Sequence, residues 1–299
     1  MTVDLEVIKK DHEQKRGKMV EKFLNLLGRD PELQAMMPDP SVAAVFEDEN
    51  LSLAQVIDAI LAAYSERPAL GMRDYRIRTN PANGKKEREY LPAFKTVTFG
   101  EHRADIQAIA SAWTQGDDLA ISPESFLCII GFASTQYNAL LTAAHYAHVV
   151  PVPMQSSTSG ADMDEIFANI NPSAVAATVQ DIVMAARHVV VHGNVPTLVV
   201  FDYDGRDESD LELVAQARHL MQEGGVATRL LTFQQLVDAG RELEWTFLPP
   251  RSGEQTDHTA LILHSSGSTG KPKGAMLNEV AWKSSWNPSE DRAPMLSVV

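Results

Sequence analysis

The residues of this 299-residue chain that are best suited to chemistry lie in one stretch rich in glycine and hydroxyl side chains. Small residues let a backbone approach a ligand closely, while hydroxyl and amide groups donate hydrogen bonds to phosphate oxygens. Two lysines in the stretch add positive charge that attracts phosphate. The sequence therefore predicts a phosphate-binding loop, which consists of Ser265, Ser266, Gly267, Ser268, Thr269, Gly270, Lys271, Pro272, Lys273 and Gly274.

Two common glycine motifs do not fit this loop. In a Walker loop the residue after the lysine is serine or threonine, whereas Pro272 follows Lys271 here. In a nucleophile elbow of the G-x-S-x-G type the glycines are farther apart than Gly267 and Gly270. Because apolar residues stand on both sides of the loop, we expect it to join two strands rather than to open a helix, which disfavours a Walker-type kinase.

The ten residues from 265 to 274 resemble the phosphate-loop signature of the adenylate-forming, or AMP-binding, enzymes. This superfamily includes acyl-CoA synthetases, luciferases, peptide-synthetase adenylation domains and carboxylic acid reductases. The nearly obligatory basic residue of the signature falls on Lys273, and Lys271 falls on a variable position. The resemblance implies that Lys273 is the catalytic contact and that the other residues hold the nucleotide: Ser265, Ser266, Gly267, Ser268, Thr269, Gly270, Lys271 and Gly274.

Other segments extend the resemblance over about residues 53–299. Residues 96–113 are similar to the strand and helix that open the family's adenylation domain, and 126–154 and 198–207 are most similar to carboxylic acid reductases. The resemblance implies that a carboxylic acid reacts with ATP and Mg²⁺ to give an acyl-adenylate and pyrophosphate. In carboxylic acid reductases the acyl group then passes to phosphopantetheine on a carrier domain, and a reductase domain uses NADPH to form an aldehyde. We expect these domains in a full-length protein.

The later motifs of the family do not follow Gly274 in this sequence, including those for adenine, for ribose and for the lid lysine. We therefore expect the chain to be an N-terminal part of a larger enzyme, and to be inactive alone. Two alternatives stay open. The chain could belong to a fatty-acyl-CoA or acyl-AMP ligase, or it could be a nucleotide-binding remnant without catalysis.

The pattern of apolar residues predicts the strands and helices that position the loop. From residue 97 onward, short apolar runs alternate with helical stretches, which is typical of an α/β fold with a doubly wound, mostly parallel sheet and flanking helices. Strands are expected at 97–99, 126–130, 149–154, 174–179, 197–202, 229–232 and 259–264. Helices are expected between them at 101–115, 136–148, 161–169, 181–192, 209–223 and 233–242.

The part of the chain before residue 97 lacks this alternation of strands and helices. It predicts helices at 3–28 and 52–66, the second capped by Ser52, and a hairpin at 73–90. As domains we expect an N-terminal helical segment at 1–50 and an incomplete AMP-binding domain at 51–299.

Composition narrows the function classes. Lysine plus arginine total 26 against 40 aspartate plus glutamate, a net charge of −14, which argues against a nucleic-acid or anionic-membrane binder. The single cysteine, Cys128, excludes an internal disulfide and a cysteine-based metal site, and we interpret it as a core residue. The charged N-terminus and the lack of a long apolar run predict a cytoplasmic protein.

Other polar groups are interpreted as structural. The histidines form two pairs at helical spacing that lack a third ligand, so no metal site is expected: His145 with His148, and His188 with His192. The acidic stretch 202–210 and the basic run 85–88 are expected to be solvated, the first as a loop and the second as an edge strand. His264 is expected to fill a strand-end position, and Trp282 and Trp286 to pack in the core.

Overall fold

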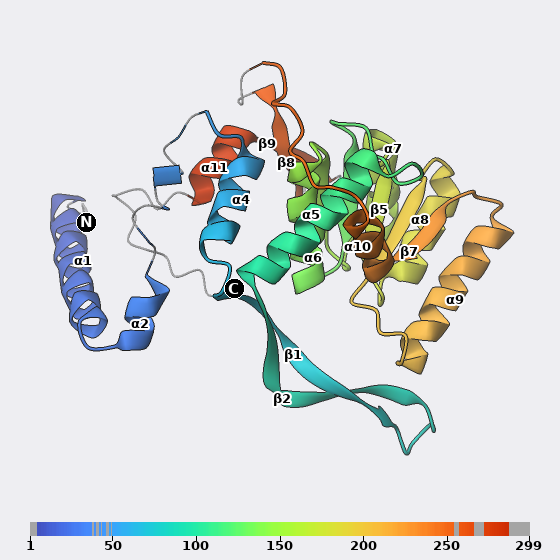
Figure 1. Ribbon diagram of the computed structural model, residues 1–299, viewed down its shortest axis with the longest axis horizontal. Helices are drawn as coiled ribbons and strands as arrows, with labels where there is room; N and C mark the ends of the chain where they lie inside the picture. The colour runs from blue at the N-terminus through green and yellow to red at the C-terminus, as the bar shows by residue number, and fades with distance from the viewer. Residues whose placement is uncertain are drawn as a thin grey trace. The chain divides into compact units, whose positions relative to one another are not determined.

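The computed structural model describes residues 5–37, 39, 42, 44–45, 48, 50–253, 257–265 and 272–286. The chain divides into two compact units (Figure 1). One consists of Met1–Asp48 with Ser285–Val299, and the other of Glu49–Ser284. The first unit holds α1 (Leu5–Leu27) and α2 (Pro31–Met36), and Asp30 caps α2 by accepting from the amides of Glu32 and Leu33. The predicted first helix is thus confirmed over its described residues.

The second unit is built on a parallel sheet of five strands. These are β3 (Phe126–Ile130), β4 (Val150–Met154), β5 (Ala174–Thr178), β6 (Thr197–Phe201) and β7 (Arg229–Thr232), in the spatial order β4-β3-β5-β6-β7. Each of the five strands lies within about a residue of its predicted position. The strands are short and almost wholly buried, as strands covered on both faces must be.

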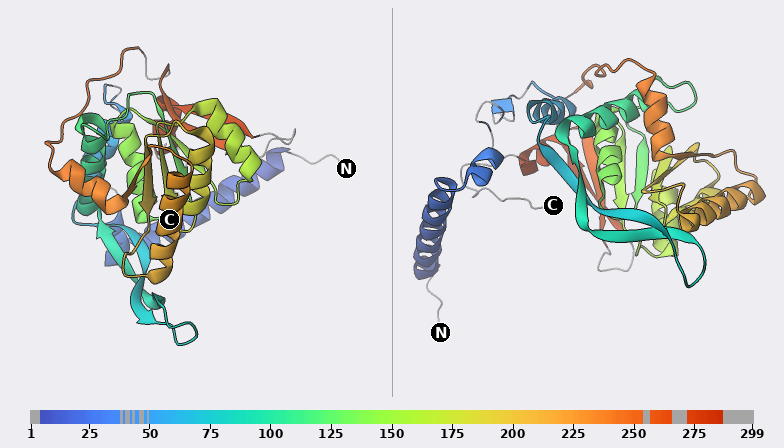
Figure 2. Two further views of the ribbon diagram at one scale, coloured as in Figure 1. Left: turned by 90° about the vertical axis from the view of Figure 1, so that its right-hand side faces the viewer. Right: turned by 60° about the horizontal axis from the view of Figure 1, so that its bottom comes forward.

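Helices cover both faces of this sheet (Figure 2), which confirms the doubly wound α/β fold. One core contains residues of α4 (Leu53–Ala63), α5 (Phe99–Gln115), α6 (Thr135–Tyr146) and α10 (Phe233–Arg241). The other contains residues of α7 (Gly160–Ile170), α8 (Ile182–His192) and α9 (Glu208–Glu223). Successive side chains of β3 point to opposite faces of the sheet and so belong to both cores. Leu127 and Ile129 lie in the first core, and Cys128 and Ile130 lie in the second. No helix of the described residues is long and apolar enough to cross a bilayer.

The strand order reverses beside β3. The chain leaves β3 for β4 on one side, then returns to place β5, β6 and β7 on the other side. In open α/β sheets, ligands bind at the carboxyl ends of the strands where such a reversal occurs. The carboxyl edge near β3 and β5 is therefore the part of this fold best placed to hold a ligand.

A two-stranded antiparallel ribbon of β8 (Thr259–Ser265) and β9 (Lys273–Asn278) lies beside β4 and leads into α11 (Glu279–Trp286). At the start of β8, His258 Nδ1 lies 3.9 Å from the carboxylate of Glu124, which precedes β3. The amide of Glu124 donates to the carbonyl of His148, which precedes β4. Thus β8 starts at the amino ends of β3 and β4 and runs in their direction, so its last residue, Ser265, is at the carboxyl edge.

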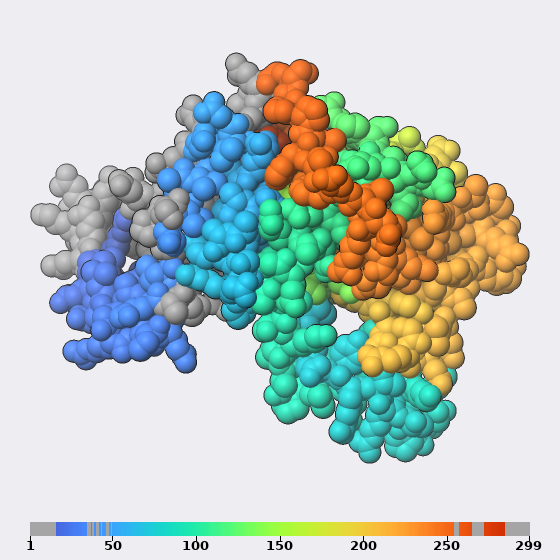
Figure 3. Space-filling model, in the orientation of Figure 1, coloured from blue at the N-terminus to red at the C-terminus, as the bar shows by residue number. Residues whose placement is uncertain are grey.

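A second ribbon consists of β1 (Pro68–Thr79) and β2 (Lys86–Thr98), and is longer than the hairpin expected at 73–90. Its turn contains Gly84 at φ 74°, a conformation that favours glycine. The ribbon contacts α5, α6 and α9, and the space-filling view shows it, in cyan, against the yellow segment (Figure 3).

Two predicted strands belong elsewhere than expected. The run 97–99 is not a strand of the parallel sheet, because Val97 and Thr98 end β2 and Phe99 starts α5. Thr98 ends the strand by forming a capping box with Glu101, the same device by which Ser52 and Gln55 start α4. The run 259–264 does form a strand, but β8 pairs with β9 and not with the five-stranded sheet.

Close packing of α10 on α5 depends on Gly240. A Cβ atom at this position would lie 1.7 Å from the carbonyl oxygen of Ala108, so the two helices would have to move apart. We expect Gly240→Ala to lower the free energy of unfolding by about 1–3 kcal/mol, although alanine is the better helix former. Urea unfolding followed by circular dichroism measures the change. The control is Gly160→Ala, where the new Cβ meets nothing within 4 Å; equal midpoints for the two variants would contradict the prediction.

Candidate functional site

The ends of the predicted phosphate loop are held by the β8–β9 ribbon. Backbone pairing places His264 opposite Gly274, and Ser265 opposite Lys273. The expectation that the loop joins two strands is therefore confirmed. Ser265, Lys273 and Gly274 are at the mouth of the ribbon. Pro272 is also described, whereas six loop residues lie outside the described part of the chain: Ser266, Gly267, Ser268, Thr269, Gly270 and Lys271.

Three described residues at the mouth of the ribbon have distinct surroundings: Lys273, Gly274 and His264. Lys273 is exposed as the first residue of β9. Gly274 lets the ribbon close tightly, since a Cβ there would lie 3.0 Å from Ile262 Cγ2 and 3.2 Å from His264 Nε2. His264 is half-buried, and burial lowers the pKa of its imidazole, which favours the neutral ring at pH 7. Its Nδ1 is buried and has no hydrogen-bond partner among the described residues.

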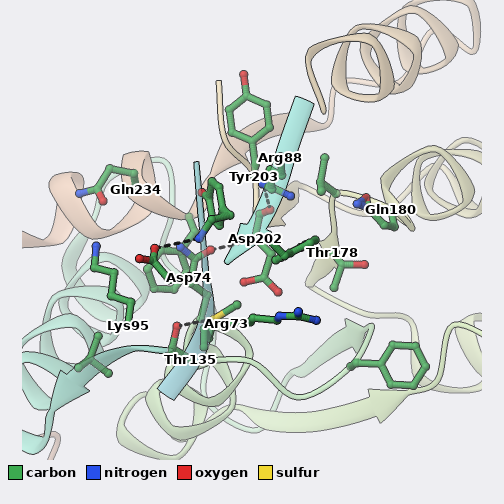
Figure 4. Close-up of a pocket in the computed structure, with 18 of the residues that line it drawn as sticks. Arg73, Asp74, Arg88, Lys95, Thr135, Thr178, Gln180, Asp202, Tyr203 and Gln234 are labelled. Atoms are coloured by element: carbon green, nitrogen blue, oxygen red, sulfur yellow. Dashed lines mark hydrogen bonds between the residues drawn. The ribbon is translucent and has the colours of Figure 1, made fainter. Parts of the chain in front are cut away.

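A cavity of about 590 Å³ lies at the carboxyl edge of the parallel sheet (Figure 4). The floor comes from the residues that end or follow β3, β5 and β6, including Phe132, Thr178 and Asp202. The β1–β2 ribbon forms another wall, and α5, α6 and α10 complete the lining. The sequence analysis assigned no role to these residues, although Phe132 and Asp202 lie in segments that resemble carboxylic acid reductases. A further signal is position, since Thr178 and Asp202 are at the ends of predicted strands and Phe132 follows one closely.

The acidic stretch 202–210 was expected to be solvated, and this prediction is wrong. Asp204, Asp207 and Asp210 are buried and bind the β1–β2 ribbon. The guanidinium of Arg88 donates to Asp210 Oδ2 at 2.5 Å and to the carbonyl of Asp202 at 2.8 Å. Its backbone amide donates to Asp207 Oδ2 at 3.0 Å.

Electrostatics distinguish the members of this acidic cluster. Burial raises the pKa of the Asp210 carboxyl to about 6, against the attraction of Arg88. Hydrogen bonds from Arg206 hold the pKa of Asp204 well below its ordinary range, and Tyr75 donates to the same carboxylate at 2.9 Å.

The basic run 85–88 is likewise only partly a solvated edge. Lys85 pairs with Glu212 on the surface at 2.6 Å, as a solvated residue does. The side chain of Arg88 is only 11% exposed, because it is directed into the acidic cluster. Lys85 precedes β2 and Arg88 lies within it, and both side chains pair with acidic residues of α9 (Glu212 and Asp210). The run therefore fastens the ribbon to the sheet.

The histidine pairs occupy separate, mostly buried places. Burial lowers the pKa of His145 to about 3 and that of His148 to about 4. His188 Nδ1 lies 2.6 Å from the Asp164 carboxylate, and His192 lies 3.5 Å from it. In the ranges that the structure describes, no three His, Cys, Asp or Glu side chains are grouped so that they could hold a metal ion.

The two remaining predictions concern core residues. Cys128 is fully buried, and burial raises the pKa of its thiol, so the prediction of an inert core cysteine is confirmed. Trp282 packs against the first core, as expected. The side chain of Trp286 lies outside the described residues.

Comparisons with known proteins agree with this architecture. The sequence profile of the family described as AMP-binding enzyme matches residues 79–285, so the chain belongs to the AMP-binding enzyme family. Within the family it is similar to carboxylic acid reductases. That of Segniliparus rugosus is 33% identical over 277 residues, which is 91% of this chain and 23% of the relative. That of Mycobacterium tuberculosis is 32% identical over 266 residues, 89% of this chain and 22% of the relative.

Solved structures give the same picture. The structure of the A-PCP didomain of the Segniliparus rugosus reductase, in complex with AMP, matches 87% of this chain and 36% of its own length with a TM-score of 0.81. A red-emitting luciferase from Phrixothrix hirtus matches 80% of this chain with a TM-score of 0.53 and 16% identity, which shows the fold alone. The chain spans about a fifth of the length of the curated relatives that it matches.

Proposed function

We propose that this chain supplies the phosphate-binding part of a site that activates a carboxylic acid with ATP. In this reaction a carboxylate oxygen attacks the α-phosphorus of ATP, the bond from that phosphorus to the bridging oxygen of the β-phosphate breaks, and pyrophosphate leaves. The products are an acyl-adenylate and pyrophosphate. The proposal is supported by the sequence of the phosphate loop and by the match to the family. The ends of this loop belong to the β8–β9 ribbon, and its Ser265 end is at the carboxyl edge of the sheet, where ligands bind in such folds.

The residues at the mouth of the ribbon suit the electrostatic demand of this step. Carboxylate and triphosphate are both anionic, so positive charge and amide donors must offset their repulsion. On this proposal Lys273, the exposed first residue of β9, supplies charge, and the small residues between Ser265 and Gly274 supply hydrogen-bond donors. Mg²⁺ on the phosphate oxygens would add charge.

The identity to carboxylic acid reductases, 33% over nine-tenths of the chain, favours that subfamily over the ligases. On this proposal the acyl group passes next to a phosphopantetheine thiol on a carrier domain, and NADPH reduces the thioester to an aldehyde. A fatty-acyl-CoA or acyl-AMP ligase is the second candidate. A putative long-chain-fatty-acid CoA ligase from Rhodopseudomonas palustris shares the fold at 15% identity and a TM-score of 0.51.

The purified 299-residue chain provides the direct test. We expect it to bind MgATP weakly, because one loop buries only part of a nucleotide and must offset the entropy of association. Phosphorus NMR of the β- and γ-phosphates measures the binding, and Lys273→Ala should remove most of the perturbation. If the wild-type chain left the phosphate signals unchanged, or if Lys273→Ala perturbed them equally, the assignment of the phosphate site would be wrong.

A turnover assay complements the binding experiment. The chain is incubated with ATP, Mg²⁺ and a panel of aromatic and aliphatic acids, and released pyrophosphate is measured. We expect no release of pyrophosphate above the uncatalysed rate, because catalysis requires both reactants to be held close together in the correct orientation. Turnover at the rate of a complete adenylation domain would contradict the proposal that this chain supplies only one wall of the site.

A further inference from the structure

The cavity at the carboxyl edge has the position and size of a ligand site in its own right. It lies where the strand order reverses, and its volume of about 590 Å³ is in the range of small-molecule pockets. Among the residues that the structure describes, β8 and β9 contribute nothing to its lining. The cavity is therefore separate from the described arms of the phosphate loop.

Unusual backbone conformations at two strand ends shape the floor of the cavity. Gly131, directly after β3, has φ 142°, and a Cβ there would lie 2.3 Å from Thr178 Cγ2. Asp202, directly after β6, has φ 55°, which costs free energy in a residue other than glycine. Two hydrogen bonds hold it there, because its amide donates to Gln136 at 2.7 Å and its carbonyl accepts from Arg88 at 2.8 Å. Such strained positions cluster at ligand sites.

Side chains of both charges line the cavity, among them Arg73 and Asp202. Burial raises the pKa of the Asp202 carboxyl, whereas a hydrogen bond from Ser134 and the nearby charge of Arg88 favour the carboxylate. No salt bridge of the described residues includes Asp202. Arg73 comes from the β1 wall, and its Nε donates to the carbonyl of Leu91 at 3.3 Å. That bond uses one of the five N–H donors of the guanidinium and leaves both terminal nitrogens for a ligand. Figure 4 shows both side chains among the residues around the cavity.

Apolar surface accompanies these charges. Phe132 follows Gly131 at the end of β3, is 75% exposed and lines the cavity. Tyr203, Phe233 and Val179 add further aromatic and aliphatic lining. A ligand complementary to this cavity has an anionic group for Arg73, a cationic hydrogen-bond donor for Asp202 and an apolar part for the aromatic and aliphatic side chains.

We propose that this cavity binds an α-amino acid with an apolar side chain, whose carboxylate pairs with Arg73 and whose ammonium group pairs with Asp202. The β1–β2 wall is held in place for such a ligand, because Arg88, which also lines the cavity, donates to Asp207 and Asp210 of the acidic cluster. We expect binding at this site without ATP, because the described residues of β8 and β9 do not line the cavity.

The test uses the wild-type 299-residue chain and three matched probes in isothermal titration calorimetry without nucleotide. L-phenylalanine carries both charges, 3-phenylpropionate lacks the ammonium group, and 2-phenylethylamine lacks the carboxylate. We expect L-phenylalanine to bind, and each analogue to bind at least tenfold more weakly. No binding of L-phenylalanine, or equal affinities for the three probes, would overturn the proposal without any variant being made.

Two variants then assign the charges. Arg73→Gln should weaken L-phenylalanine and 3-phenylpropionate at least tenfold and leave 2-phenylethylamine unchanged. Asp202→Asn, which keeps a residue that tolerates positive φ, should weaken L-phenylalanine and 2-phenylethylamine and spare 3-phenylpropionate. The control is Arg76→Gln on the same strand, where the side chain is exposed and pairs with Glu89. Any other pattern among the probes would refute the proposed pairing.

The outcome is independent of the proposed adenylation. Lys273→Ala should leave the affinity for L-phenylalanine unchanged while it removes the response to MgATP. Loss of both ligands in that variant would mean that the cavity is part of the nucleotide site, and would overturn the inference of a separate site.

Discussion

Arg88→Met is expected to lower the free energy of unfolding of the 299-residue chain by about 3–5 kcal/mol. The reason is burial. The side chain of Arg88 is 11% exposed and that of its partner Asp210 is 2% exposed, so the variant leaves a buried carboxylate without its cation. Methionine fills a similar volume, so loss of packing is small. Urea unfolding monitored by circular dichroism measures the effect.

The control is Arg76→Met on the neighbouring strand. Arg76 pairs with Glu89 at 2.6 Å, yet 60% of its side chain is exposed, so water replaces the interaction and little stability should be lost. If the two variants unfolded at the same urea concentration, the buried cluster would not be what fastens the β1–β2 ribbon to the sheet.

The penalty in Arg88→Met should depend on pH. In the folded chain the pKa of Asp210 is about 6, which is above its value in the unfolded chain. Folding therefore takes up a proton between about pH 4 and pH 6, and this carboxyl contributes less to stability as pH rises through that window. Removing Arg88 raises the pKa of Asp210 further. The loss of unfolding free energy should thus be larger at pH 8 than at pH 5, and a constant loss would contradict this account.

Local patterns were sufficient to predict most of the parallel sheet. The runs at β3 and β5 are short and apolar, and the run at β7 has two buried leucines at its centre. Local sequence and tertiary burial favour the same structure there. The same consistency predicted the start of α4, where Ser52 and Gln55 form a capping box. The predicted loop between two strands depended on apolar residues on both sides, which is also local information.

The misassigned elements depend on distant partners. Charge alone indicated a solvated stretch at 202–210, whereas Arg88, more than a hundred residues earlier in the chain, buries it. The run 97–99 ends β2 because β1 is available to pair with it. The cavity was not predicted for the same reason, since Arg73 and Asp202 are brought to one edge only by the docked ribbon and the reversed strand order. Single-sequence patterns carry no information on such pairings.

Lys273→Ala is expected to slow acyl-adenylate formation by about 10²–10³-fold in the full-length enzyme that the proposed function implies. This corresponds to about 2.7–4 kcal/mol of transition-state stabilisation, the usual contribution of one well-placed electrostatic donor. ATP-dependent pyrophosphate exchange measures the step. Lys273 is exposed at the first position of β9, so its removal should leave the unfolding midpoint unchanged and the loss should be kinetic.

Two matched variants test whether the effect of Lys273→Ala depends on the position of the lost positive charge or only on the loss of a charge. Lys271→Ala removes the same charge two residues earlier, at the variable position of the signature, and should have a smaller effect. Lys273→Arg keeps the charge at the mouth of the ribbon and should retain more activity than Lys273→Ala, although arginine places its donors differently. Pyrophosphate exchange by Lys273→Ala at the wild-type rate, or a greater loss in Lys271→Ala, would show that the loop meets the phosphates through residues other than the one at its β9 end.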